Sequence, residues 1–324
     1  MAGPSSASLP DEVVQFLTRS GLASAGESLR AEPLSGGVSS DIWRVDLARG
    51  PVCVKRALAR LRVAKTWEAP VERNRFECDW FRTAAEAVPD AVPRVLAQGE
   101  RLFAMEYLEP RNHPVWKELL RRGDADRAFA CRVGASLACI HSATAGRDEI
   151  ARRFATDAIF HSIRLEPYLE AVGLTDLARR TAATKLCLVH GDVSPKNILA
   201  GPSGPVFLDA ECAWYGDPAF DLAFCLNHLL LKCRWTPRAS AAFLECFDAL
   251  ASAYLAGVSF PGLEQRAATL LPGLLLARID GKSPVEYLSS ETDKRAVREV
   301  ARALLASPPA NLSEVRETWR KSLP

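Results

Sequence analysis

The part of the sequence that decides the fold is HGDVSPKN at residues 190–197, followed by LDAE at residues 208–211. Between them, two short apolar runs lie on either side of the turn GPSGP at residues 201–205. Apolar runs that flank a turn rich in Gly and Pro predict a β-hairpin. This hairpin would bring two carboxylates and an amide to one edge, so we expect chemistry at this place.

The three side chains at this edge, Asp192, Asn197 and Asp209, are of the kinds that phosphoryl transfer requires. The reaction uses one carboxylate to orient the attacking hydroxyl and accept its proton, and oxygen ligands for Mg²⁺ at the nucleotide phosphates. Asp192 suits the first role. Asn197 and Asp209 suit the second, because Asp-x-x-x-x-Asn is the spacing of the catalytic loop of protein kinases. The structural alternative, in which Asp192 and Asn197 only cap turns, leaves the second carboxylate unexplained.

The composition is that of an ordinary folded protein. Of 324 residues, 48% are hydrophobic and 25% charged, and this length predicts two lobes. The net charge of +2 is too small for a basic surface that binds phosphate backbones. We therefore expect no nucleic acid partner.

Several features of the sequence favour the cytoplasm. The first nine residues have neither the positive nor the apolar region of a secretory signal. The longest uncharged apolar runs, at 222–231 and 267–277, are too short to span a membrane, so we expect no membrane partner. The nine cysteines are odd in number and form no C-x-x-C pair, which is typical of reduced core cysteines.

The pattern of apolar residues changes near residue 108. Before it, a short helix at about 10–20 and a charged helical segment at 71–87 accompany strand-like stretches at 42–47, 52–54 and 102–107. After it, apolar residues recur at helical spacing, most clearly at 222–231, 239–255, 263–279 and 292–305. We predict an α+β protein with a β-rich N-lobe at residues 1–108 and a mainly helical C-lobe at residues 109–324.

The run from His190 through Asp192 to Asn197, with Asp209 and Asp221 downstream, resembles the aminoglycoside phosphotransferase and choline kinase-like superfamily. The resemblance covers about residues 30–290. It implies a two-lobed protein kinase-like fold, with ATP or GTP and Mg²⁺ as cofactors and a small-molecule hydroxyl as acceptor. It leaves the oligomeric state open.

The resemblance also implies a nucleotide site in the N-lobe. LSGGVSS at 34–40 is similar to the family's phosphate-covering loop, and VCVK at 52–55 to the strand with the nucleotide lysine. Glycines let backbone N–H groups approach phosphates, and a lysine supplies a compact positive charge. The implied nucleotide-binding residues of these two segments are Ser35, Gly36, Gly37, Ser39 and Lys55.

Lys55 needs an anionic partner, and by analogy with the kinase Lys–Glu pair we expect Glu77, with Glu72 as the alternative. The stretch FAMEYL at 103–108 resembles the hinge strand that contacts adenine through backbone groups. Its candidate contacts are Met105, Glu106 and Leu108. These residues are equally compatible with an apolar strand that leads into a linker and does not contact a nucleotide.

Glu211 follows Asp209 by two residues and is a candidate metal ligand. The sequence is equally compatible with two alternatives, in which Glu211 contacts the acceptor or supports the metal ligands without touching the metal. Asp217 and Asp221 are expected to brace the loop and cap the next helix. His190 is expected to be structural, through a hydrogen bond to the backbone near the metal loop. His141 is expected to be a satisfied core histidine.

We therefore predict an ATP- and Mg²⁺-dependent phosphotransferase that acts on a hydroxyl of a sugar, aminoglycoside, amino alcohol or hydroxy amino acid. Two alternatives are a kinase-like protein that binds nucleotide without catalysis and a protein kinase. Only seven residues separate Asp209 from Asp217, which leaves no room for an activation loop. DAECAWYG at 209–216 is similar to the pattern of methylthioribose kinases, whereas the loop at 192–195 departs from theirs, so the acceptor stays open.

Overall fold

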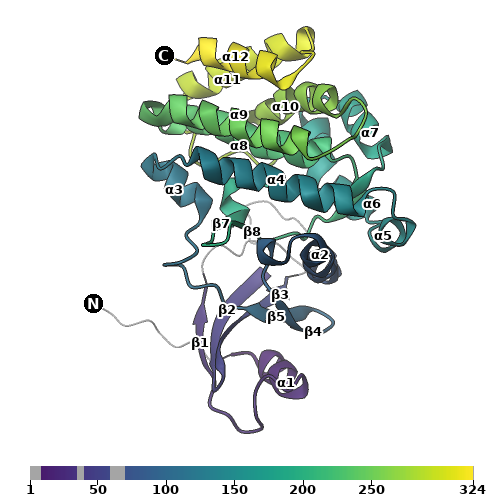
Figure 1. Cartoon of the computed structure of the whole chain (residues 1–324), viewed down its shortest axis with the longest axis vertical. Coiled ribbons are helices and arrows are strands. Elements are labelled where there is room, and N and C mark those ends of the chain that lie inside the picture. Colours follow the sequence, from purple (N-terminus) through teal and green to yellow (C-terminus); the bar gives the residue numbers. More distant parts are fainter. Residues whose placement is uncertain (1–8, 35–39, 59–69, 324) are drawn as a thin grey trace.

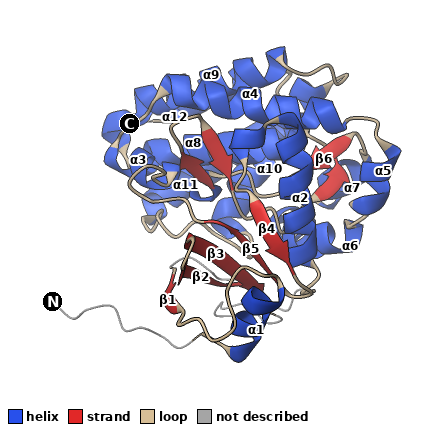
Figure 2. Cartoon of the chain, turned by 60° about the horizontal axis from the view of Figure 1, so that its bottom comes forward, coloured by secondary structure: helices blue, strands red, loops and turns tan. Residues whose placement is uncertain are grey.

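The computed structural model describes residues 9–34, 40–58 and 70–323. Strands gather in a small lobe and most helices in a larger one, as Figure 1 shows along the molecule. Figure 2, in which strands are red and helices blue, shows the same separation from another direction. The predicted α+β architecture with two lobes is confirmed.

The small lobe is built around an antiparallel sheet that contains five strands in the described residues, in the order β1-β2-β3-β5-β4. Two helices accompany it. The elements are α1 (Asp11–Arg19), β1 (Arg30–Pro33), β2 (Ser40–Leu47), β3 (Gly50–Ala57), α2 (Arg73–Ala87), β4 (Val95–Gln98) and β5 (Leu102–Glu106). The sequence predicted β2, β3 and β5 but missed β1 and β4. Both are short edge strands without a regular apolar alternation, and β1 ends in a proline, which edge positions tolerate.

Side chains alternate along β3 and β5, which decides which residues lie on the face of the sheet that is directed toward the large lobe. Val54 and Ala104 lie in a small cluster with α1 on one face of the sheet. Cys53 and Phe103 lie on the other face, in the hydrophobic core that continues through α2 into the large lobe. Lys55 is two residues beyond Cys53 in β3 and pairs in register with Phe103, so it is on the face directed toward the large lobe.

The large lobe consists mainly of helices stacked around α8. Nearly every residue of α8 is buried, including the polar residues Asp221, Asn227, His228 and Lys232. α9 packs between α8 and α4, and α10 packs on α8. The helices are α3 (Trp116–Arg122), α4 (Arg127–Thr144), α5 (Asp148–Arg153), α6 (Asp157–Phe160), a π-helical segment (His161–Leu169), α7 (Thr175–Ala183), α8 (Ala219–Trp235), α9 (Ser240–Ala256), α10 (Leu263–Asp280), α11 (Glu291–Ala306) and α12 (Leu312–Ser322).

The close contact between α4 and α9 requires a glycine. A Cβ atom on Gly134 would lie 2.3 Å from the carbonyl oxygen of Leu250, so any larger residue would push the two helices apart. The stretch Pro237–Ala256, which includes α9, is long and apolar enough for a membrane span by length and composition. Half of it is buried against the neighbouring helices, which accounts for its apolar character.

The large lobe also contains two small antiparallel strand pairs. β7 (Ile198–Ala200) pairs with β8 (Pro205–Phe207), which confirms the hairpin predicted from the sequence. β6 (Cys187–Val189) pairs with β9 (Trp214–Gly216), a strand that the sequence did not predict. Residues 190–197 therefore connect β6 to β7, and Asp209 follows β8 closely.

We expect Trp80→Ala to lower the free energy of unfolding by about 3–5 kcal/mol, because a fully buried indole would leave a cavity. Trp80 on α2 packs edge-on against His190 and Phe207, so it joins the two lobes. Arg75→Ala on the same helix is the control and should change stability by less than about 0.5 kcal/mol, since Arg75 is exposed. Urea denaturation measures both. Equal losses would contradict the role of α2 as an interlobe anchor.

Candidate active site

The loop at residues 190–197 is held by a buried carboxylate from the large lobe. Asp221, in the first turn of α8, is fully buried. Its Oδ2 accepts a hydrogen bond from the backbone N–H of His190 at 2.7 Å, and its Oδ1 accepts one from Gly191 at 2.8 Å. The start of the loop is thereby fixed to the central helix. The expectation that Asp221 braces the loop is confirmed.

Asp221 is itself held by the neighbouring helices. His141 on α4 lies with Nε2 3.2 Å from Oδ2 of Asp221, and its Nδ1 is 2.7 Å from the hydroxyl of Tyr254 on α9. Both ring nitrogens therefore have partners, and the expectation of a satisfied core histidine is confirmed. Asp217 accepts a hydrogen bond from the N–H of Ala219 at the start of α8, as expected of a helix cap.

His190 links the two segments that carry the candidate site. Its Nδ1 accepts a hydrogen bond from the N–H of Asp192 at 3.1 Å, and its Nε2 lies 3.1 Å from the carbonyl oxygen of Leu208. Burial lowers the pKa of His190, which suits a neutral ring that accepts at one nitrogen and donates at the other. The structural role expected of His190 is confirmed.

Gly191 makes this arrangement possible. Its φ is +80°, and a Cβ atom there would lie 2.7 Å from the carbonyl oxygen of Cys212. A side chain at this position would be strained and would also displace the segment that follows Asp209.

Asp192 is buried and lies between two cations. Its Oδ2 is 2.9 Å from Nη2 of Arg164 and 3.2 Å from Nζ of Lys196. Burial alone would raise the pKa of Asp192, but the charges of Lys196 and Arg164 outweigh it and hold the pKa below its ordinary value. The carboxylate is therefore ionised at neutral pH and can only accept hydrogen bonds.

Arg164 was not found from the sequence. It lies in the π-helical segment His161–Leu169, and its Nε also donates to the carbonyl oxygen of Gly191 at 2.5 Å. Nothing in the local pattern distinguishes Arg164 from an ordinary helix arginine. Only the tertiary fold brings it to the loop.

Lys55 lies between carboxylates from both lobes. Its Nζ is 2.7 Å from Oε2 of Glu77 on α2 and 2.5 Å from Oδ1 of Asp209. The structure thus pairs Lys55 with Glu77 and not with Glu72. Burial disfavours the ammonium, but the charges of Asp209 and Glu77 outweigh it and raise the pKa of Lys55. Burial raises the pKa of Glu77 to about 7, against the charge of Lys55.

Asn197 and Asp209 supply the oxygens that a divalent cation prefers. The Nδ2 of Asn197 donates to the backbone oxygen of Asp192 at 3.1 Å, so its amide oxygen is the atom that can face a cation. Asp209 has a φ of +65°, and it is the single residue other than glycine with a positive φ among the described residues. Such a conformation costs about 1–3 kcal/mol and is most common at functional sites.

Glu211 lies close to Asp209 but has another partner. Its Oε2 is 3.0 Å from Nε of Arg73, a buried arginine in the first turn of α2. Among the described residues there is no group of three or more His, Cys, Asp and Glu side chains that could hold a metal ion. A Mg²⁺ site here would thus need Asn197, water or the nucleotide itself in addition to the carboxylates, which is usual for this ion.

The candidate hinge residues lie at the end of β5. Met105 is buried in the shared core. The N–H of Glu106 donates to the carbonyl oxygen of Arg94, so of its two backbone groups only the carbonyl oxygen stays available to a ligand. Glu106 and Leu108 border a hollow of about 280 Å³ together with the β7–β8 turn. Ser35, Gly36, Gly37 and Ser39 lie outside the described residues.

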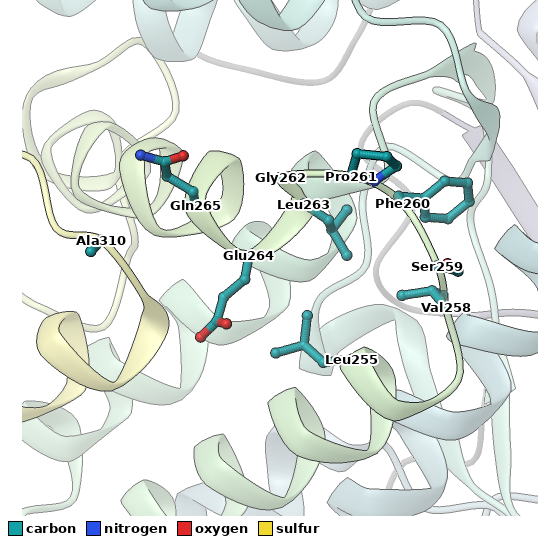
Figure 3. A pocket seen from close by; sticks show the side chains of 10 residues that line it. All are labelled: Leu255, Val258, Ser259, Phe260, Pro261, Gly262, Leu263, Glu264, Gln265 and Ala310. Atoms are coloured by element: carbon teal, nitrogen blue, oxygen red, sulfur yellow. The ribbon is translucent and has the colours of Figure 1, made fainter.

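A larger hollow of about 470 Å³ lies away from these residues, between the end of α9 and the start of α10. Figure 3 shows its lining, in which Glu264 is the single charged side chain. Glu264 accepts a hydrogen bond from the N–H of Leu312, the first residue of α12. The charged group of this hollow therefore joins two helices.

Residues 30–250 of the chain match the phosphotransferase enzyme family. A search of curated proteins finds no significant match. Among solved structures, the chain is similar to a choline/ethanolamine kinase family protein from Mesorhizobium loti, with a TM-score of 0.55 and 16% identity, over 96% of this chain and 99% of that one.

The chain is also similar to an ethanolamine kinase from Plasmodium vivax, with a TM-score of 0.53 and 11% identity, over 95% of this chain and 86% of that one. A third similar structure is the streptomycin–ATP–APH(2″)-IIa ternary complex, with a TM-score of 0.50 and 15% identity, over 96% of this chain and 99% of that one. These similarities show that the fold is the two-lobed, kinase-like one expected from the sequence.

We expect Asp221→Asn to lower the free energy of unfolding by about 3 kcal/mol, because an amide cannot accept from both N–H groups and His141 at once. Asp126→Asn is the matched control. Asp126 also accepts from two backbone N–H groups, at the start of α4, where Asn serves equally well. Urea denaturation of both variants measures the difference. A loss no larger than that of the control would show that Asp221 does not hold the loop.

Proposed function

Because the chain belongs to the phosphotransferase enzyme family, we propose that it transfers the γ-phosphoryl group of ATP to a hydroxyl of a small molecule, with Mg²⁺ as cofactor. One observation carries the proposal: an ionised carboxylate, Asp192, and a lysine bound by two carboxylates, Lys55, are brought together by separate lobes. The similar ternary complex that contains ATP and streptomycin supports a nucleotide at this site.

Asp192 is the proposed base. Its ionised carboxylate can accept a hydrogen bond from the acceptor hydroxyl and so orient the oxygen toward the phosphorus. With a lowered pKa it is a weak base, which suits a loose transition state in which the hydroxyl loses its proton late. Arg164 is the proposed positioning residue, since it fixes both the carboxylate and the backbone of Gly191.

Lys55 is the proposed ligand of the nucleotide phosphates, and Glu77 fixes its ammonium in the apolar core between β3 and α2. Asn197 and Asp209 would hold Mg²⁺, which neutralises negative charge on the phosphates. Glu211 is proposed to act through Arg73 and not as a metal ligand, because its carboxylate already pairs with that guanidinium. The backbone at Ser35, Gly36, Gly37 and Ser39 and the hinge groups of Met105, Glu106 and Leu108 complete the proposed nucleotide site.

A small acceptor fits the segment after Asp209 better than a protein does. β9 begins at Trp214 and pairs with β6, and α8 begins at Ala219, so the chain returns to the core at once. The short segment therefore offers no extended surface on which a peptide substrate would bind. The nine cysteines are free thiols, which is consistent with the cytoplasm as the proposed location.

We expect Asp192→Asn to lower kcat by about a hundredfold or more while ATP affinity changes little, because a base acts mainly on the transition state. The measurement is ATP consumption with sugars, amino alcohols, hydroxy acids and aminoglycosides, together with nucleotide binding by calorimetry. Asp176→Asn, an exposed carboxylate on α7, is the control and should keep full turnover. Nucleotide binding without turnover of any acceptor in the wild type would favour a binding protein instead.

We expect Asp209→Ala to abolish Mg²⁺-dependent ATP binding and Glu211→Ala to weaken it less, because Glu211 is bound to Arg73. Calorimetric titration of each variant with Mg²⁺ at a fixed ATP concentration separates the two roles. An equal loss of binding in both variants would show that Glu211 is a metal ligand. No loss in either variant would show that Mg²⁺ does not bind at this edge of the hairpin.

A further inference from the structure

A continuous surface of polar and aromatic side chains extends from Asp192 along one side of α8. The guanidinium of Arg164, which pairs with Asp192, also lies over the rings of Tyr168 and Phe224, 5.7 and 5.9 Å from their centroids. The ring of Phe224 is in turn 5.4 Å from that of His228, one helical turn further along α8. The surface thus begins at the proposed base.

The same surface continues to α10 and the segment after it. Nη1 of Arg278 donates to the hydroxyl of Tyr168 at 3.1 Å. The hydroxyl of Tyr287 lies 3.4 Å from Nδ1 of His228. We call this surface the acceptor wall and define it by Arg164, Tyr168, Phe224, His228, Lys232, Arg278 and Tyr287.

Lys232 is at the far end of the acceptor wall and is almost completely buried. Its Nζ lies 4.6 Å from the ring centroids of both Trp235 and Tyr287. Nevertheless, Nζ has no hydrogen-bond partner among the residues that the structure describes. Nε2 of His228 and Nε of Arg278 also lack one there. Other buried atoms of the described residues, such as Nε1 of Trp116 and of Trp319, also lack a partner. These three differ in that they belong to one wall that begins at the proposed base, so a single ligand there would supply all of them.

Burial, and next the charge of Lys117, lowers the pKa of Lys232 to about 7. The protein by itself therefore destabilises the ammonium at this position. An anion beside Nζ would favour the charged form again, because opposite charges attract strongly where water is excluded.

The charges differ between the two ends of the acceptor wall. Near the proposed base, Arg164 and Lys196 are accompanied by the carboxylates of Asp192, Asp209 and Glu211. At the far end, the cations Lys232, Arg278 and Lys117 outnumber the carboxylates Glu118 and Glu286, and Glu286 already pairs with Lys117. A cationic molecule would meet like charges here, whereas an anionic one would be attracted.

We propose that the acceptor carries an anionic group, in the simplest case a carboxylate, which Lys232, Arg278 and His228 bind while its hydroxyl reaches Asp192. The proposal rests on the proposed function and specifies its substrate class. From Phe224 to Lys232, α8 advances by eight residues, which corresponds to a rise of about 12 Å. This length suits a hydroxy acid of roughly three to six carbons, once side chains extend from both ends.

Direct binding without nucleotide tests the proposal independently of catalysis. The probes are three pairs of compounds that differ in charge: glycerate and glycerol, gluconate and glucose, and homoserine and choline. Glycerol 3-phosphate is tested separately, to find whether the bound anionic group is a phosphate. Thermal unfolding is followed at equal ionic strength. We expect at least one acid to raise the Tm of the wild type by several degrees and its neutral or cationic counterpart to leave it unchanged. Stabilisation by the phosphate alone would assign the anionic group as a phosphate.

Lys232→Met tests the assignment to this wall, and Lys185→Met is the matched control. Lys185 also lies over a tryptophan ring, at 4.0 Å from the centroid of Trp214, but it pairs with Asp157 away from the wall. We expect Lys232→Met to remove the stabilisation by the acid and Lys185→Met to retain it. With that acid as acceptor, KM should rise about tenfold or more in Lys232→Met, with a smaller change in kcat.

The results that overturn this proposal differ from those that overturn the proposed function. An acid that stabilises Lys232→Met as much as the wild type, or neutral and cationic compounds that bind as well as the acids, would refute the anionic acceptor. So would the absence of binding by every acid and by glycerol 3-phosphate. ATP consumption with a neutral or cationic acceptor would in that case still support the phosphotransferase. Binding of an acid without its phosphorylation would instead support the anion site and refute the transfer.

Discussion

The candidate site depends on the buried carboxylate of Asp221. A loop that must present Asp192 at a fixed place cannot also rely on strand pairing, so the N–H groups of His190 and Gly191 need other acceptors. Asp221 accepts from both, and His141 and Tyr254 fix it in turn to α4 and α9. The position of the proposed base is thereby set by the rigid helical core of the large lobe and not by the loop itself.

The contact between the lobes at Lys55 has a different physical basis. Besides the packing of α2 and the ion pair of Arg73 with Glu211, the small lobe meets the site through the ammonium of Lys55. This ammonium lies between two carboxylates, Glu77 from its own lobe and Asp209 from the other. Coulombic attraction is strong here because water is excluded, but it has little preference for direction. Replacing Lys55 by another cation beside Asp209 would therefore need no rearrangement of the core. This property suits the proposed role of Asp209, which would hold a metal only when the nucleotide is bound.

Much of this organisation could be predicted from the sequence, because it rests on local patterns. The hairpin at Asn197 and Asp209 and the long helices follow from apolar periodicity and turn residues. The pairing of Lys55 with Glu77 was expected from the analogy with kinases, with Glu72 as the alternative. Arg164, Arg73 and Lys232 could not be found in this way. Each contributes through contacts with residues far away in the chain, and a single charge in a helix has no local pattern that distinguishes it from a solvated one.

The cations near the proposed base connect the two proposals. Lys196 and Arg164 hold the pKa of Asp192 below its ordinary value, and Arg164 is also the first residue of the acceptor wall that continues to Lys232. A site with these cations has a weak base, so it cannot rely on early removal of the hydroxyl proton. The rate acceleration at this site must therefore come from the placement of the acceptor. An acceptor bound at both ends, by its anionic group at Lys232 and by its hydroxyl at Asp192, loses its rotational freedom before the phosphoryl group moves, which is the contribution that a loose transition state rewards most.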